Sequence, residues 1–78
     1  MIVIYTQDET FLREDADAAK GVLASVYGKK LGAEAYTAVK NDREGTSYRK
    51  YGGPLVRVVS KEEAAEIREK ETAIGMMQ

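Results

Sequence analysis

Basic and aromatic side chains alternate in the middle of the chain, and these are the residues best suited to do chemistry. The 78-residue chain carries a net charge of −1, yet the stretch from Tyr27 to Arg57 holds seven Lys or Arg against three Asp or Glu. Four of the five tyrosines lie in the same stretch. Basic side chains with interleaved rings track phosphates and stack on bases, and Tyr and Arg are also favoured anchors of protein interfaces. The candidate partner-binding residues are Tyr36, Arg43, Tyr48, Arg49, Lys50 and Tyr51.

The chain has neither histidine nor cysteine, which removes the commonest catalytic groups. Without cysteine there is no disulfide, thiolate zinc site or iron–sulfur cluster. Without histidine the usual proton carrier of acid–base and triad catalysis is missing. The pair Gly52-Gly53 offers backbone amides to an anion, but no Gly-Lys-Ser/Thr motif accompanies it. We therefore expect a protein that is not an enzyme and takes no cofactor and no metal.

The length of the chain predicts one domain spanning residues 1–78. Its amino end lacks the basic region and long apolar run of a secretory signal. No stretch approaches the ~18 apolar residues of a membrane span. Secreted domains of this size usually need disulfides, so we expect a cytoplasmic protein that does not bind membranes.

Two elements are predicted in the first third of the chain. The apolar and β-branched run within Met1–Thr6 is typical of a buried strand. Leu12, Ala16, Ala19, Leu23 and Val26 recur at helical spacing. This pattern predicts a helix that begins at an Asp8 cap and ends at Gly28 or Gly32.

The middle of the chain predicts a strand over Ala33–Lys40, although its three alanines also suit a helix. Thr46–Tyr51 is expected to pair back on that strand as a hairpin. This pairing would bring Tyr36, Tyr48 and Lys50 onto the open face of the sheet, opposite the helices.

The last third of the chain predicts a strand and a helix. Gly52-Gly53-Pro54 interrupts the pairing as a bulge or turn, and Leu55–Val59 forms a further strand. Ser60 and Glu63 form a capping box for a helix that Gly75 ends. The predicted fold class is α+β: a small single domain with a βαββα-like mixed sheet of three to four strands and two helices on one face.

The opening Met1–Thr6, with Gly53-Pro54-Leu55-Val56 further on, resembles the start and the proline strand of glutaredoxins. The resemblance implies a similar βαβ start. The position of the reactive Cys-x-x-Cys is occupied by Asp8, Glu9, Thr10 and Phe11, so redox function is not expected.

These observations favour a small non-enzymatic modulator that binds another protein. In size and composition the chain is similar to the small inhibitors carried by phages and mobile elements, anti-CRISPR proteins among them. The alternative is a single-stranded nucleic-acid-binding module that uses the same basic, tyrosine-rich face. Pairing of an open sheet face or strand edge also makes a homodimer an alternative assembly.

Overall fold

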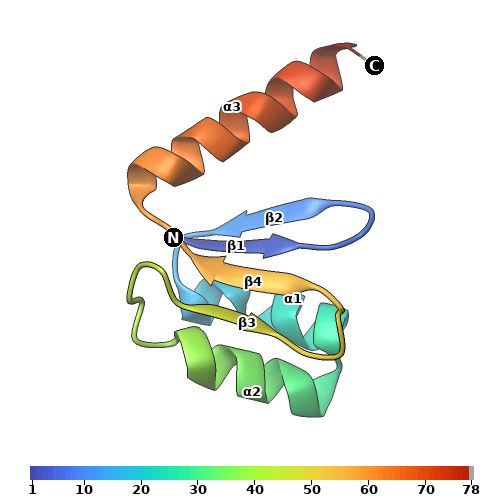
Figure 1. The fold of residues 1–78 in the computed structure, drawn as a ribbon, viewed down its shortest axis with the longest axis vertical. Coiled ribbons are helices and arrows are strands. Elements are labelled where there is room, and N and C mark those ends of the chain that lie inside the picture. The colour runs from blue at the N-terminus through green and yellow to red at the C-terminus, as the bar shows by residue number, and fades with distance from the viewer. Residues whose placement is uncertain (78) are drawn as a thin grey trace.

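The computed structural model describes residues 1–77, with side chains to residue 70, and has three helices and one sheet (Figure 1). The sheet has the order β2-β1-β4-β3, and every neighbouring pair is antiparallel. The α+β class and a four-stranded sheet are thus confirmed, whereas the expected mixed sheet is wrong. The elements are β1 (Ile2–Tyr5), β2 (Thr10–Arg13), α1 (Ala16–Tyr27), α2 (Lys29–Val39), β3 (Ser47–Arg49), β4 (Leu55–Val58) and α3 (Lys61–Met77).

A tight hairpin joins β1 to β2, so the segment after Asp8 is a strand and not the start of a helix. Tyr5 pairs with Thr10, and the Thr6 amide donates to the Glu9 carbonyl at 2.9 Å. The Thr6 hydroxyl donates to the same carbonyl at 2.8 Å and accepts from the amides of Asp8 and Glu9 at 3.3 and 3.0 Å. Asp8 therefore lies in a turn that a threonine side chain organises.

The first helix begins seven residues later than the Asp8 cap predicts. Asp15 is its N-cap and accepts from the Ala18 amide at 2.8 Å. The buried face of α1 consists of Ala16, Ala19 and Leu23. Gly28, with φ of 88°, ends α1 as predicted, because a left-handed residue after a helix is most easily a glycine.

The predicted strand over Ala33–Lys40 is wrong, because this segment lies in α2. Gly32, Ala35 and Val39 are buried at helical spacing against α1 and the sheet. A Cβ atom on Gly32 would lie 2.9 Å from the Ala24 Cα atom. The missing side chain therefore lets the backbones of α1 and α2 touch, a long-range contact that no local pattern reveals.

Because the middle strand is absent, Ser47–Arg49 pairs with Leu55–Val58 instead of the preceding segment. The amide of Gly45 donates to the Val58 carbonyl at 3.0 Å, and the Val58 amide donates to the Thr46 carbonyl at 2.8 Å. Two residues thus oppose one, which is a bulge that bends the start of β3. The strand predicted at Leu55–Val59 is confirmed as β4, and Gly52–Pro54 belongs to the β3–β4 turn.

Two helices, α1 and α2, cover one face of the sheet, whereas α3 contacts the other face only near its start and then leads away from it (Figure 1). The predicted placement of the last helix on the same face as the first is therefore wrong. α1 and α2 pack on the face that carries Ile2, Ile4, Val56 and Val58. On the other face, Val3 forms a second cluster with Val59, which follows β4, and with Ala64 and Ile67 of α3. The Glu63 amide donates to Ser60 Oγ at 3.1 Å, as the cap predicts, but α3 continues through Gly75 to Met77.

Both edges of the sheet are blunted against pairing with another strand. At the β2 edge, the Arg13 guanidinium donates to the Leu12 carbonyl at 2.7 Å. The β3 edge is three residues long and follows the bulge at Gly45. Short strands, bulges and charged side chains are the usual means of preventing edge-to-edge association.

Candidate functional site

The tip of the β3–β4 hairpin presents an aromatic ring to solvent. Tyr51 is 91% exposed. It has φ of 56°, Gly52 follows with φ of 67°, and the Gly53 amide donates to the Lys50 carbonyl at 2.9 Å. Tyr51 and Gly52 are the central residues of a tight turn within the connection 50–54 between β3 and β4, and a positive φ at the first central position favours Asn or Gly. A tyrosine in this conformation is strained by roughly 1 kcal/mol. Neither burial of the ring nor the backbone conformation therefore explains why a tyrosine occupies this position. We name residues Arg49–Gly52 the Tyr51 tip.

Two further tyrosines, Tyr27 and Tyr48, hold the residues on either side of the Tyr51 tip in place. The rings of Tyr27 and Tyr48 meet edge to face, with centroids 5.4 Å apart and planes at 78°. The Tyr27 hydroxyl donates to the Pro54 carbonyl, and the Tyr48 carbonyl lies 3.4 Å from the same hydroxyl. The Tyr48 hydroxyl donates to Glu34 at 3.0 Å. These contacts join the β3–β4 hairpin to α1 and α2, so the residues next to the turn are packed against both helices.

The six predicted contact residues do not share one surface. Arg49, Lys50 and Tyr51 lie together in the Tyr51 tip. Tyr48 lies on the helix side of the sheet and packs against the core, so its expected place on the open face is wrong. Arg43 lies in the exposed loop at the other end of β3 (Figure 1).

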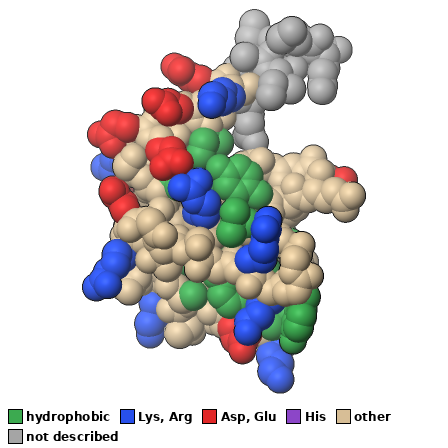
Figure 2. Space-filling view, in the orientation of Figure 1, with side chains coloured by type: hydrophobic (Ala, Val, Ile, Leu, Met, Phe, Trp, Pro, Cys, Tyr) green, Lys and Arg blue, Asp and Glu red, His purple; other side chains and the backbone are tan. Residues whose placement is uncertain are grey.

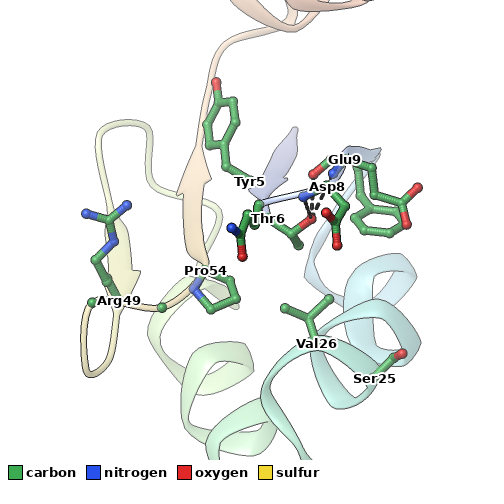
Figure 3. Close-up of a pocket in the computed structure, with 12 residues that line it drawn as sticks. Tyr5, Thr6, Asp8, Glu9, Ser25, Val26, Arg49 and Pro54 are labelled. Carbon is green, nitrogen blue, oxygen red and sulfur yellow. Dashed lines mark hydrogen bonds between the residues drawn. The ribbon is translucent and has the colours of Figure 1, made fainter.

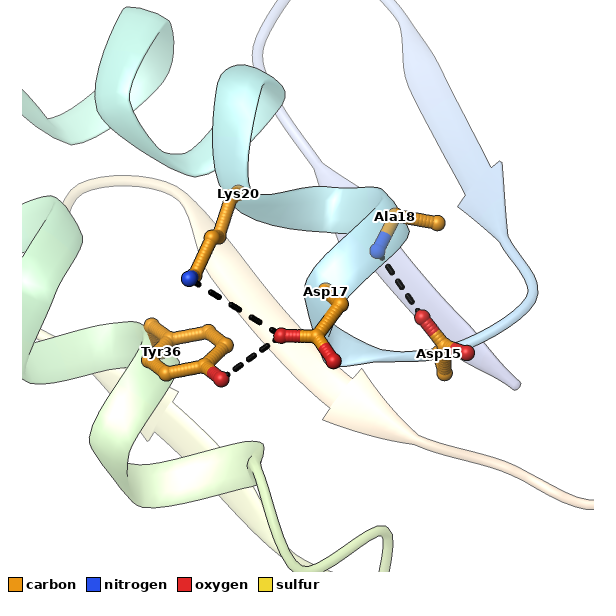
Figure 4. Close-up of polar contacts among 5 residues, drawn as sticks. All are labelled: Asp15, Asp17, Ala18, Lys20 and Tyr36. Atoms are coloured by element: carbon orange, nitrogen blue, oxygen red, sulfur yellow. Dashed lines mark hydrogen bonds and ion pairs between the residues drawn. The ribbon is translucent and has the colours of Figure 1, made fainter.

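Tyr36 joins the two helices and is not on the sheet at all (Figure 4). Its hydroxyl donates to Asp17 at 2.7 Å. Lys20 lies 3.9 Å from the same carboxylate and 4.6 Å from the centroid of the Tyr36 ring. This exposed cluster fastens α2 to the start of α1, which is a structural role.

The basic stretch of the sequence, residues 27–57, lies at the end of the molecule opposite α3 (Figure 1). In Figure 2, most Lys and Arg side chains of the lower part lie where Figure 1 places α2 and the β3–β4 hairpin, and acidic side chains gather toward α3. Lys50 lines a shallow hollow with Ala33, Glu34 and Thr37 of α2. The Tyr51 tip itself contains the exposed Arg49 and Lys50, and their positive charge favours association with acidic partners.

The three tyrosines that join the hairpin and helices resist ionisation. Partial burial, with the hydrogen bond to Glu34, raises the pKa of Tyr48 to about 12. Burial raises the pKa of Tyr27, against a smaller lowering by Arg49. The hydrogen bond to Asp17 raises the pKa of Tyr36. In all three residues the folded state favours the protonated phenol over the phenolate, and the pKa therefore lies above its ordinary value of 10.0.

We expect the free energy of unfolding to be constant through neutral pH and to fall as the pH rises from 10 toward 12. In this range the unfolded chain has released tyrosine protons that the folded chain still holds, so alkali favours unfolding. The variant Tyr48→Phe keeps the ring but cannot ionise, so its stability should fall less steeply. Urea unfolding followed by circular dichroism, at a series of alkaline pH values, measures both slopes. Equal slopes for the two proteins would contradict the assignment to Tyr48.

A groove that the sequence does not indicate lies beside the Tyr51 tip (Figure 3). Its volume is about 700 Å³, and its walls come from three separate segments. We name it the loop groove; its main lining residues are Thr6–Glu9 of the first hairpin, Ser25 and Val26 of α1, and Arg49 and Gly52–Pro54 of the second hairpin. The polar Gln7-Asp8 pair between two apolar runs is the one signal that indicates the first of these loops.

Among the residues that the structure describes, no group of three or more Asp or Glu side chains could hold a metal ion. In the part of the chain that the structure describes, no helix is long and apolar enough to cross a membrane. No protein-family model matches the sequence, and neither a curated protein nor a solved structure matches the chain significantly. The function must therefore be argued from the surface itself.

Proposed function

We propose that the chain is a small protein-binding module whose principal contact is the Tyr51 tip. The observation that carries the proposal is Tyr51, which is 91% exposed and has a φ of 56° that a tyrosine adopts at a cost. A rigid exposed tyrosine is a favoured anchor at protein interfaces, because it buries a large ring with little loss of side-chain entropy. The exposed Arg49 and Lys50 flank this ring.

A nucleic-acid partner is the second candidate, and one observation favours it. Lys29 and Lys30 begin α2 and are separated by Gly28 alone from Tyr27, whose hydroxyl contacts the β3–β4 hairpin. With Arg49 and Lys50, they make a positive surface around an exposed ring, which suits a single strand. Asp8 and Glu9 line the adjoining groove and would repel phosphates, so the protein partner is the better-supported proposal.

The deciding variant is Tyr51→Gly, which removes the ring and also relieves the left-handed backbone. We expect it to be as stable as the wild type or up to about 1 kcal/mol more stable. Partner affinity should fall about 30-fold, the loss of a 2 kcal/mol anchor. Affinity capture from a lysate, with and without nuclease, followed by titration of the captured protein, measures the effect.

Two exposed lysines serve as a matched pair of controls. Lys50→Ala should weaken capture, whereas Lys61→Ala at the start of α3 should not change it. Capture that Tyr51→Gly leaves unchanged would refute the Tyr51 tip as the contact. Capture that nuclease abolishes, and that weakens steeply with added salt, would establish the nucleic-acid alternative instead.

A further inference from the structure

The loop groove has the volume of a recognition site and is lined in part by apolar side chains. Its volume of about 700 Å³ lies within the usual range of ligand-binding clefts. Apolar surface comes from Phe11, Val26 and Pro54, and in Figure 3 Val26 and Pro54 lie on the side of the groove opposite the loop that carries Thr6 and Asp8. The backbone of Gly52 and Gly53 borders the groove as well. An apolar side chain of a bound segment could pack on the apolar residues, while its extended backbone lies along Gly52 and Gly53.

Both walls of the groove are held in place before any partner arrives. On one side, the Thr6 hydroxyl makes three hydrogen bonds within the Thr6–Glu9 loop. On the other side, the Tyr27 hydroxyl donates to the Pro54 carbonyl. Ordering loops on binding opposes affinity, so a groove with fixed walls binds a segment without that loss.

The two ends of the groove carry opposite charge. Asp8 and Glu9 are exposed in the first hairpin, and Arg49 comes from β3. In Figure 3 the Arg49 guanidinium points away from these two carboxylates. Among residues 1–70, for which side chains are described, neither carboxylate is paired with a Lys or Arg, and Arg49 is not paired with an acid.

We propose that the loop groove binds an extended segment of the partner protein in which an apolar residue lies between a Lys or Arg and an Asp or Glu. The base would lie at Asp8 and Glu9, the apolar side chain on Val26 and Pro54, and the acid at Arg49. Complementary charges of this kind set the register and direction of a bound segment. This inference rests on the proposed protein-binding function and assigns the chemistry of the partner.

The test is a selection of short random peptides on the immobilised full-length chain. The wild type should enrich peptides with one charge order around an apolar residue. The triple variant Asp8→Lys, Glu9→Lys and Arg49→Glu exchanges the charges at the two ends, so it should enrich the reverse order. Its affinity for the wild-type peptides should be at least about tenfold lower. The control, Glu66→Lys, Glu69→Lys and Arg68→Glu, makes the same exchange at exposed positions of α3 and should select the wild-type peptides.

The outcomes separate this inference from the proposed function. Peptides whose charge order reverses in the triple variant support the groove assignment. Peptides that need Tyr51 but show no charge order, or the same order on both proteins, overturn the groove assignment and leave the Tyr51 tip standing. If no peptide is enriched, the groove does not recognise short segments, and the assignment is wrong whatever the capture experiment shows.

Discussion

Gly32→Ala is expected to destabilise the fold by about 2 kcal/mol, in spite of alanine being the better helix former. The added Cβ would lie 2.9 Å from the Ala24 Cα atom, 3.0 Å from the Leu23 carbonyl oxygen and 3.1 Å from the Ala24 amide nitrogen. All three are backbone atoms of α1, so relief requires the whole of α2 to move. A domain of this size is stabilised on the order of 5 kcal/mol, and this change removes a large part of it.

Gly21→Ala provides the matched control in the adjacent helix. Gly21 is exposed within α1, and a Cβ there would meet nothing within 4 Å. The same substitution should therefore stabilise the protein by about 1 kcal/mol through helix propensity alone. Thermal unfolding should show midpoints shifted in opposite directions, down by about 10 °C for Gly32→Ala and up by about 5 °C for Gly21→Ala. A Gly32→Ala protein as stable as the wild type would contradict the close contact between α1 and α2.

Leu23→Ala is expected to remove about 3 kcal/mol, which leaves the fold barely stable. Leu23 is fully buried between α1 and the sheet face that carries Ile2, Ile4 and Val56. The substitution removes apolar contacts and leaves a cavity that a small core with fixed strands cannot close. Urea unfolding by circular dichroism should show a midpoint far below that of the wild type.

Leu31→Ala is the control for Leu23→Ala, with the same chemical change at a half-buried position of α2. We expect a loss of about 1 kcal/mol there, because water already reaches the side chain. Comparable losses at the two positions would mean that Leu23 does not occupy the centre of the core.

The elements that the sequence predicts correctly are those with strong local signals. The β-branched, apolar runs of β1 and β4 favour strands, and Ser60 with Glu63 indicates where α3 begins. Gly28 is a reliable end for α1, because few other residues adopt a φ of 88°. Each of these features depends on the residues within one turn or one strand.

The two wrong elements have local patterns that agree with more than one structure. In Ala33–Lys40, small and large residues alternate as in a strand, but Ala35 and Val39 are also one helical turn apart. In Thr10–Arg13, Leu12 extends the helical spacing of α1 backwards, while Thr10 and Phe11 favour a strand. Packing selects the structure that forms in each segment. Thr10–Arg13 is a strand because it pairs with β1, and the segment after Gly32 is a helix whose backbone packs directly against α1 at that glycine.

The sequence by itself determined which residue types this protein lacks and where its basic and aromatic residues cluster along the chain. The absence of histidine and cysteine and the basic character of residues 27–57 are properties of composition, which folding cannot change. Only the tertiary structure decided which of those residues reach solvent together. The face of Tyr48 depends on its pairing with Val56, and the loop groove joins segments near residues 7, 26 and 53. Register and long-range packing are set by burial of the whole chain, so they leave no trace in any single stretch of it.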